Sequence, residues 1–317
     1  MARRAVGRAL GGVALARRPD VYLAAGLLNE TNASLLAAFR GLGLTAEWLP
    51  PEAIRFRLAA GDVVLSRLDV RPTLDGVEPG LWELKRARLA GVTVLNGDDA
   101  LLTSHDKLAT ALAFAAAGVR HPRTANVDET STSPPLPLPV VLKPRFGSWG
   151  TDVCRCETEG EYAARIEQLR DRPWFRSHGV LVQELVEPRG YDLRLVVAAG
   201  RVIGAVERHA RPGEWRTNVA LGGRRRPALP DPRAVATAGG AAAAVGGDLV
   251  GVDLLPTGDG GYVVLEVNGA VDFTRHYSLD GGDVFTLAAS SLAAAAGLAP
   301  RQARVGASPP ESALGLA

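Results

Sequence analysis

The chain has 317 residues, 47% of them hydrophobic, and its 36 lysines and arginines nearly balance 34 acids, which leaves a formal charge of +2. This balance gives no electrostatic signature of a nucleic-acid partner, and no apolar run reaches the roughly 18 to 20 residues needed to span a bilayer. Cys154 and Cys156 are too close in sequence for an unstrained mutual disulfide, so we expect a reduced, cytoplasmic protein. A core of this size is expected to divide into two or three lobes.

The first clear pattern lies in residues 20–103, where short β-like runs alternate with helical stretches. The strands are expected at 21–25, 62–65 and 92–95, and the helices at 32–42 and 81–90. This alternation predicts a small N-terminal α/β lobe with a parallel sheet. Residues 1–19 are rich in arginine and lack a cleavage-site pattern, so we expect a disordered leader there, and we expect a flexible tail at 299–317.

Residues 104–298 combine helices with strands that are mostly antiparallel. A helix is expected from Ser104 to Ala117, with Ser104 as its N-cap, followed by a proline-rich link and a strand that ends at Lys143. Further helices are expected at 159–169, 232–245 and 282–296, and strands at 179–187, on both sides of Gly200, at 249–256 and at 262–269. We expect this region to form the second and third lobes.

Only three of the 36 cationic residues are lysines: Lys85, Lys107 and Lys143. Because arginine is used elsewhere for plain positive charge, a lysine indicates a position that needs a compact ammonium group. Lys143 ends an apolar strand and opens into a loop with Gly147 and Gly150, which allow backbone N–H groups to approach a phosphate. Lys107 lies in the first turn of a helix, where a cation is unfavourable, so we expect an anion nearby.

Two acids lie within otherwise apolar strands. Asp253 and Glu266 are flanked by valine and leucine, and burying a carboxylate there costs several kcal/mol unless it is paired or binds a metal. Asn268 lies two residues after Glu266 and therefore on the same face of the strand. The three side chains form an all-oxygen set suited to Mg²⁺. The alternative is a hydrogen-bonded pair of acids at the strand ends.

A series of motifs in a fixed order carries a family resemblance. They are Lys107, Lys143 in KPRFGSWG, Glu184 in VQEL, Asp192 and Arg194 in DLRL, Arg216 to Asn218 in RTN, Asp253 in VDLL, and Glu266 and Asn268 in LEVN. The series resembles the ATP-grasp superfamily and, within it, the RimK-type carboxylate-amine ligases, with the GSWG and EVN segments most similar to LysX ligases. The resemblance implies an α+β ATP-grasp fold, in which a small α/β N-terminal lobe is followed by two α+β lobes that clamp ATP.

The same resemblance implies a role for each matching residue. ATP is expected to contact Lys107, Lys143, Gly147, Ser148, Gly150, Gln183, Glu184, Leu185, Asp192, Arg216, Thr217 and Asn218. Asp253, Glu266 and Asn268 are expected to bind Mg²⁺, with Mn²⁺ as the alternative ion, and Arg194, Arg216 and Asn218 to act in catalysis. The implied reaction is phosphorylation of a carboxylate by ATP, followed by attack of an amine, which forms an amide and releases ADP and phosphate.

The substrates are less well indicated. LysX ligases have a Glu-Phe-Lys-Asn type stretch where this chain has residues 272–275, and the lysine is missing. Residues 224–226 are three consecutive arginines, which suit an acidic peptide or carrier protein but equally a solvated loop. We expect a ligase that adds glutamate or a related amino acid to a peptide or carrier protein. A small-molecule dipeptide or natural-product ligase and a non-catalytic ATP-binding regulatory protein are the alternatives, and the sequence leaves open whether the chain forms a homo-oligomer.

Overall fold

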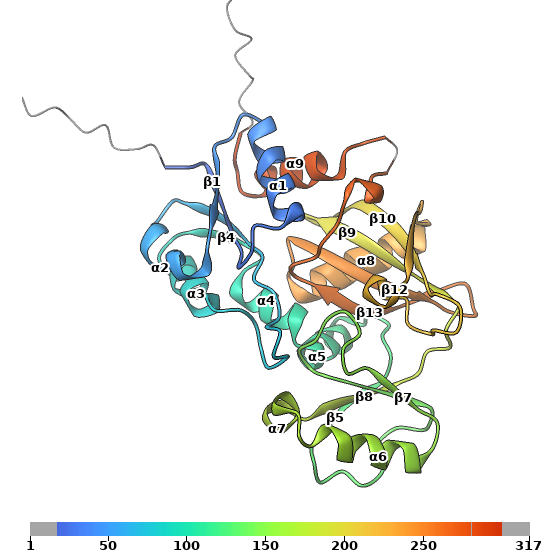
Figure 1. The fold of residues 1–317 in the computed structure, drawn as a ribbon. Coiled ribbons are helices and arrows are strands. Elements are labelled where there is room, and N and C mark those ends of the chain that lie inside the picture. The colour runs from blue at the N-terminus through green and yellow to red at the C-terminus, as the bar shows by residue number, and fades with distance from the viewer. Residues whose placement is uncertain (1–17, 280, 300–317) are drawn as a thin grey trace, which may run out of the picture.

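The computed structural model describes residues 18–279 and 281–299. The expected leader and tail lie almost wholly outside the described residues. Within them, three sheets follow one another along the chain, with helices around each sheet (Figure 1). No helix in the described ranges is long and apolar enough to cross a membrane.

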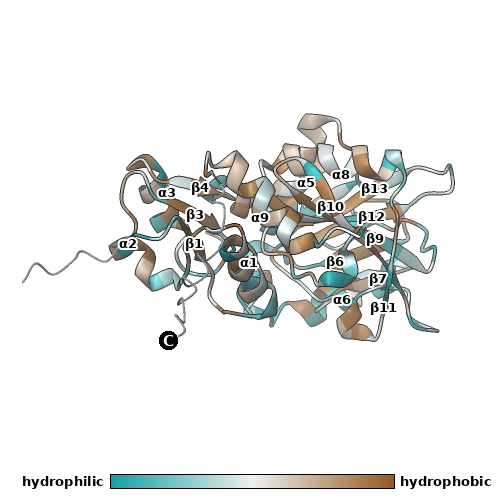
Figure 2. Ribbon diagram, turned by 90° about the horizontal axis from the view of Figure 1, so that it is seen from above, coloured by the Kyte–Doolittle hydropathy of each residue, from teal (hydrophilic) through white to brown (hydrophobic). Residues whose placement is uncertain are grey.

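The N-terminal sheet is parallel, as expected, with the strand order β2-β1-β3-β4. Its strands are β1 (Val21–Ala24), β2 (Ala46–Leu49), β3 (Val63–Ser66) and β4 (Thr93–Leu95), and its helices are α1 (Glu30–Gly41), α2 (Ile54–Arg57), α3 (Leu81–Leu89) and α4 (Asp98–His105). β1 and β3 are buried along their whole length because helices cover both faces of the sheet. Figure 2 shows these two strands as a hydrophobic centre of the lobe. β2 and α4 were not anticipated from the sequence.

The second sheet is antiparallel and has the strand order β5-β8-β6-β7. It consists of β5 (Thr124–Val127), β6 (Val140–Lys143), β7 (Cys154–Cys156) and β8 (Val180–Glu184), with α6 (Glu159–Leu169) and α7 (Pro173–His178) beside it. α6 occupies the range expected from the sequence, because Thr158 caps its first turn and Tyr162, Ile166 and Leu169 bury one face. Lys143 is the last residue of β6, as expected.

The third sheet has the order β11-β10-β9-β12-β13. Its strands are β9 (Tyr191–Ala198), β10 (Arg201–His209), β11 (Arg224–Pro227), β12 (Leu249–Pro256) and β13 (Tyr262–Asn268), and its helices are α5 (Lys107–Ala117), α8 (Pro232–Val245) and α9 (Val284–Ala295). α8 packs its alanines on one face of the sheet. α9 packs on the other face together with α1, so that one hydrophobic core joins the first and third sheets.

The start of α5 differs from the sequence-based expectation. Ser104 is not its N-cap but lies in α4 and is buried. The N-cap is Asp106, whose carboxylate accepts a hydrogen bond from the backbone N–H of Leu108 at 3.0 Å. An aspartate at this position also interacts favourably with the positive end of the helix. Asp106 therefore supplies negative charge next to Lys107, whose position in the first turn was expected to require it.

A single buried asparagine joins the first sheet to the third. Asn96 follows β4 with a positive φ of 51°, which asparagine tolerates better than most residues. Its Oδ1 atom accepts from the N–H groups of Asp248 and Leu249 at 2.7 and 2.9 Å. Its Nδ2 atom donates to the carbonyls of Leu249 and Gly269 at 2.7 and 3.0 Å. The start of β12 and the end of β13 are thus fixed to the N-terminal lobe by one side chain.

We predict that Asn96→Gly destabilises the fold strongly. Glycine accepts the positive φ, so the change isolates the loss of four hydrogen bonds, and each buried group left unpaired costs about 1–3 kcal/mol. We expect the midpoint of urea unfolding to fall by an amount that corresponds to at least about 3 kcal/mol. Asn126→Gly, at an exposed asparagine with one long hydrogen bond, is the control. An equal loss in both variants would contradict the role given to Asn96.

Candidate active site

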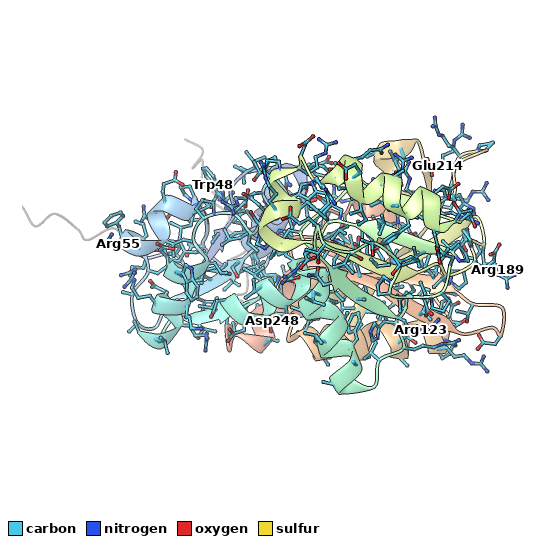
Figure 3. All side chains as sticks on the ribbon, turned by 90° about the horizontal axis from the view of Figure 1, so that it is seen from below. Trp48, Arg55, Arg123, Arg189, Glu214 and Asp248 are labelled. Carbon is cyan, nitrogen blue, oxygen red and sulfur yellow. The ribbon has the colours of Figure 1, made fainter. Side chains whose placement is uncertain are left out.

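A cavity of about 990 Å³ lies between the second and third sheets. Every residue that was expected to contact ATP lines it: Lys107, Lys143, Gly147, Ser148, Gly150, Gln183, Glu184, Leu185, Asp192, Arg216, Thr217 and Asn218. Asp253 and Glu266 line it as well. Arg189 lines the cavity, and Arg123 and Glu214 bind two of its lining residues. Figure 3 shows these three side chains at the end of the molecule that is remote from Trp48 and Arg55 in the N-terminal lobe.

Lys143 is a buried ammonium group that has no acidic partner in direct contact among the described residues. Its Nζ atom donates to Oε1 of Gln183 at 2.7 Å, and Gln183 in turn donates to Thr124 at 2.9 Å. Only 5% of the residue is exposed. Burial, with a contribution from the nearby charge of Lys107, lowers the pKa of Lys143 to about 8. An anionic ligand would supply the missing counter-charge.

Lys107 connects the glycine loop to the acidic strand β13. Its Nζ atom donates to the carbonyl oxygen of Gly147 and lies 3.5 Å from Oε2 of Glu266. The backbone N–H of Lys107 also donates to the carbonyl of Arg145 at 3.1 Å. The first turn of α5 is therefore attached to the loop at two points. The acid expected near Lys107 is provided both by Glu266 and by the N-cap Asp106.

The loop after Lys143 is shaped by residues in left-handed conformations. Trp149, Gly150 and Asp152 have φ values of 59°, 76° and 54°. A Cβ atom on Gly150 would lie 3.0 Å from Oδ1 of Asn218, so the close approach of the two segments requires glycine. Asp152 fixes the far side of the loop, because it accepts hydrogen bonds from Arg172 and from the indole N–H of Trp174, both at 3.1 Å.

Arg216 holds this loop against the third sheet. Its Nη1 atom donates to the carbonyls of Gly150 and Val153, each at 3.2 Å. Its other guanidinium nitrogens donate to Glu214 at 2.9 and 3.0 Å. The hydrogen bonds from Arg216 lower the pKa of Glu214 to about 2, so this pair stays charged at neutral pH. Arg216 therefore lies in the expected cavity, but its contacts are with the loop and with Glu214.

A chain of alternating charges crosses the third sheet. Arg208 forms a bidentate pair with Asp192 at 2.7 and 2.5 Å and also donates to Asp253 at 2.7 Å. Arg194 forms a second bidentate pair with Asp253, with both distances 2.6 Å, and lies 3.9 Å from Glu266. Burial opposes the ionisation of Asp253, but the two arginines outweigh it and hold the pKa of that carboxyl well below its usual range.

Arg208 is the functional candidate that sequence reasoning missed. It lies in VERHA, which has no local signature, and its partners are far away along the chain. It is 4% exposed, lines the cavity between the sheets and connects two buried aspartates. Asp192, Arg194 and Arg208 fall on the same face of the sheet, a placement that follows from the register of β9 with β10.

Two predicted contacts with ATP involve residues whose side chains already have partners. Both oxygens of Asp192 accept from Arg208, and one also accepts from Thr217. The carboxylate of Glu184 accepts from the backbone and side chain of Arg123 at 3.0 and 2.7 Å, and the backbone N–H of Glu184 donates to the carbonyl of Arg123 at 3.0 Å. These roles remain predictions.

Of the three residues expected to bind metal, Glu266 and Asn268 fit Mg²⁺ in donor chemistry, whereas both oxygens of Asp253 already accept hydrogen bonds from Arg194 and Arg208. Asp253 and Glu266 are directly opposite on β12 and β13, and Glu266 and Asn268 share one face of β13. Among the described residues, the Nδ2 atom of Asn268 is buried without a hydrogen-bond partner, and the Oδ1 atom of this side chain is the one that could bind Mg²⁺. The described residues contain no preformed cluster of three histidine, cysteine or acidic ligands. Mg²⁺ is commonly held by one or two carboxylates together with substrate phosphates, which such a set can provide.

A second cavity, of about 890 Å³, adjoins the first. Ser148, Trp149, Arg208, Asn218 and Glu266 line both cavities. Arg194 and Asn268 line only the second, which extends to the N-terminal lobe. The other residues around it are Asp69, Val219, Ala220, Arg225, Ala270, Val271 and Asp272.

A buried arginine of the N-terminal lobe fixes the floor of the second cavity. Arg67, which follows β3, donates to Oδ1 of Asn32 at 2.6 Å and to the carbonyl of Val271 at 2.7 Å. Its third nitrogen, Nη1, is buried without a partner, and burial lowers the pKa of Arg67 to about 10. Thr31 adds a hydrogen bond to the carbonyl of Phe273 at 3.2 Å. The segment after β13 is therefore held by the first lobe.

A model of the RimK-like ATP-grasp domain matches residues 108–284. The chain belongs to this family. Its members are ADP-forming ligases that use ATP and Mg²⁺, and the chain is such a ligase. The expected family, α+β fold class and enzyme class are confirmed.

Two curated relatives are similar over most of the chain. A probable alpha-L-glutamate ligase of Aeromonas salmonicida is 31% identical over 72% of this chain and 75% of its own length. The glutamate--LysW ligase ArgX of Sulfurisphaera tokodaii is 30% identical over 58% of this chain and 67% of its own length.

Solved structures show the same fold. A RimK domain ATP-grasp protein of Sphaerobacter thermophilus has a TM-score of 0.61 at 26% identity and covers 86% of this chain and 98% of its own. The ATP-grasp ligase PsnB, in complex with a minimal precursor, Mg and ADP, has a TM-score of 0.62 at 19% identity and covers 88% and 98%. Because PsnB is only 19% identical to this chain, the similarity between the two shows a shared fold and no more.

We predict that ATP affinity falls as the pH rises through about 8. Because the pKa of Lys143 is lowered in the free protein, this ammonium loses its proton from about pH 8 upward, and phosphate binding must then restore it. Calorimetric titration of the protein with a non-hydrolysable ATP analogue at pH 7.0 to 9.5 should show net proton uptake above pH 8.

Lys143→Arg is the matched variant for this measurement, since a guanidinium stays charged over the whole range. It should bind the analogue more weakly at pH 7, because its geometry differs, but without the fall in affinity between pH 8 and 9.5. The same pH dependence in both proteins would show that another group titrates.

Proposed function

We propose that this ligase joins glutamate or a related amino acid to a carboxylate of a peptide or carrier protein, through an acyl-phosphate made from ATP. ATP would occupy the cavity between the second and third sheets, and the two other substrates the adjoining cavity. The proposal also includes a cytoplasmic location, which is supported by two free cysteines in the described residues.

The observation that carries this proposal is the shared wall of the two cavities. Arg208, Asn218 and Glu266 face both of them. A phosphoryl group at this wall would lie within reach of a carboxylate in the second cavity, which is the requirement for direct transfer. Arg194 and Arg208 provide guanidinium groups on the substrate side, where a carboxylate has to bind.

Each step of the reaction has a set of residues suited to it. A carboxylate oxygen of the substrate attacks the γ-phosphorus, and ADP leaves while Lys107 and Lys143 neutralise phosphate charge. The amine then attacks the acyl carbon, phosphate departs, and the nitrogen gives up a proton as the amide forms. The loop around Gly150, held by Arg216, covers the cavity and excludes water that would hydrolyse the acyl-phosphate. Mg²⁺ held at Glu266 and Asn268 would supply further charge neutralisation.

The choice of glutamate is supported by the names of the two curated relatives, both of which are glutamate ligases. The charges of the second cavity are compatible with an amino-acid substrate, because Arg194, Arg208 and Arg225 are opposed by Asp69 and Asp272. Arginines suit its carboxylates, and the acids suit an ammonium group before it is deprotonated. LysX ligases have a lysine in the segment that corresponds to residues 272–275, and this chain lacks it. This is the main sequence difference that bears on the choice of glutamate.

The proposal predicts that ADP release requires both an amine and a carboxylate substrate. Purified protein with Mg²⁺ and ATP would be assayed for ADP and phosphate against amino acids alone and then with peptides that end in glutamate. We expect one pair to raise the rate well above that of either substrate alone and to yield a product heavier by one condensation. Turnover with two free amino acids and no peptide would favour a dipeptide ligase. ATP binding without ADP release for any pair would favour a regulatory protein.

We further predict that Glu266→Gln lowers kcat by at least about 100-fold, because it removes a charge at the position where both cavities meet. ATP affinity should fall by less than about tenfold, since both lysines remain. Glu207→Gln is the control, as Glu207 lies on β10 and its side chain binds only His209 among the described residues. Full activity in Glu266→Gln would remove Glu266 from the reaction.

A further inference from the structure

The arginine run at 224–226 forms a strand at the open edge of the third sheet. β11 pairs with β10 on one side and has no strand on its other side among the described residues. All four of its residues are exposed, and Figure 2 shows it at the periphery of the molecule. Edge strands present unpaired backbone groups that can pair with another chain, and native proteins usually protect such edges.

The arginines of β11 lack acidic partners. Within the part of the chain that the structure describes, no ion pair or hydrogen bond of the side chains of Arg224, Arg225 or Arg226 is present. Arg226 lies opposite Glu207, but that carboxylate accepts from His209 at 2.7 Å. Arg225 lies directly opposite Arg208, whose own charge is paired with Asp192 and Asp253. This surface therefore carries three solvent-exposed arginines that have no ion pair among the described residues.

The surface is continuous with the substrate cavity. Arg225, Arg208 and Arg194 come from three adjacent strands, lie on one face of the sheet and all line the second cavity. Exposed hydrophobic side chains border the same cavity, namely Trp149, 66% exposed, and Val219, 37% exposed. Arg224 and Arg226 do not line this cavity, so a free amino acid bound in it would not contact them, whereas a longer polypeptide would reach them.

We propose that β11 is the docking strand for an acidic, extended segment of the acceptor polypeptide. The segment adds to the open edge as a further strand, its carboxylates neutralise Arg224 to Arg226, and the residues beyond it enter the second cavity. Four residues of β11 span about 13 Å, which accommodates about four residues of the partner. This inference rests on the proposed function, because it concerns the acceptor of that reaction.

The charges of the terminal segments of this chain do not suit either segment as the occupant of the β11 edge. Residues 1–17 contain arginines and no acid, and residues 300–317 contain a single acid, Glu311, with two arginines. Neither sequence is complementary to three unpaired arginines. An acidic partner is complementary, because its carboxylates attract the arginines of β11.

A peptide of eight glutamates with a fluorescent label is the probe, and one of eight glutamines is its neutral counterpart. Fluorescence anisotropy of the full chain should show binding of the first that weakens with salt, and at least tenfold weaker binding of the second. The triple variant R224E/R225E/R226E should bind the acidic peptide at least tenfold more weakly. The control R55E/R176E/R201E changes three exposed arginines elsewhere by the same charge. Its affinity for the acidic peptide should stay within about twofold of that of the unmodified protein.

A third peptide tests strand pairing without any change in the protein. Methylation of alternate backbone nitrogens keeps all eight carboxylates but removes donors needed for a strand ladder, and we expect at least fivefold weaker binding. Equal binding of this peptide would overturn strand addition. Equal losses in both triple variants, or no binding of the acidic peptide to the unmodified protein, would overturn β11 as the docking site. None of these binding measurements requires ATP turnover. A failure of the proposed ligase reaction would therefore be seen separately, in the assay of ADP release.

Discussion

The chain of charges across the third sheet is the constraint on which the site depends. Asp192, Arg208, Asp253 and Arg194 are all held within the sheet by bidentate or short ion pairs. Breaking one member of such a buried network would leave an uncompensated charge at a cost of about 3–5 kcal/mol. The network therefore fixes the positions of the groups at its end, Glu266 and Lys107, more firmly than packing alone would. Lys143 stands outside these pairs and leaves the cavity with positive charge for phosphates.

The position of the site follows from the alternation of side chains along β9. On one face of the strand, Asp192 and Arg194 are followed by Val196 and Ala198. The two apolar residues pack into the core with α9 and α1, while the two charged ones lie where helices no longer cover the sheet. The site is therefore at the boundary between the covered and uncovered parts of one sheet face. Hydrogen bonds from Asn96 and Arg67 then join this boundary to the N-terminal lobe.

Much of the local structure was predictable because its signals are local. Thr158 and Asp231 cap α6 and α8, and both helices were expected at their observed bounds. Asp253 and Glu266 stood out as acids in apolar strands, and the pairing of β12 with β13 places them opposite each other. Arg208 and Asn96 were not predictable, because their partners lie on other strands and neither residue has a distinctive neighbourhood in sequence. The second cavity depends on how two lobes meet, and no segment alone encodes that.

The second sheet brings Lys143 to the site without sharing a hydrophobic core with the third sheet. Its buried residues form a cluster of their own, apart from those that join the first and third sheets. Where the glycine loop meets the rest of the molecule, polar contacts dominate, notably those of Lys107 with Gly147 and of Arg216 with Gly150. Two of the groups that position this loop, Lys107 and Arg216, are thus cations expected to contact ATP, and the Arg145–Asp106 pair and the contacts of Asp152 hold it as well. A phosphate that drew either side chain away from a loop carbonyl would weaken the attachment of the loop, so nucleotide binding and loop position are coupled through the same donors.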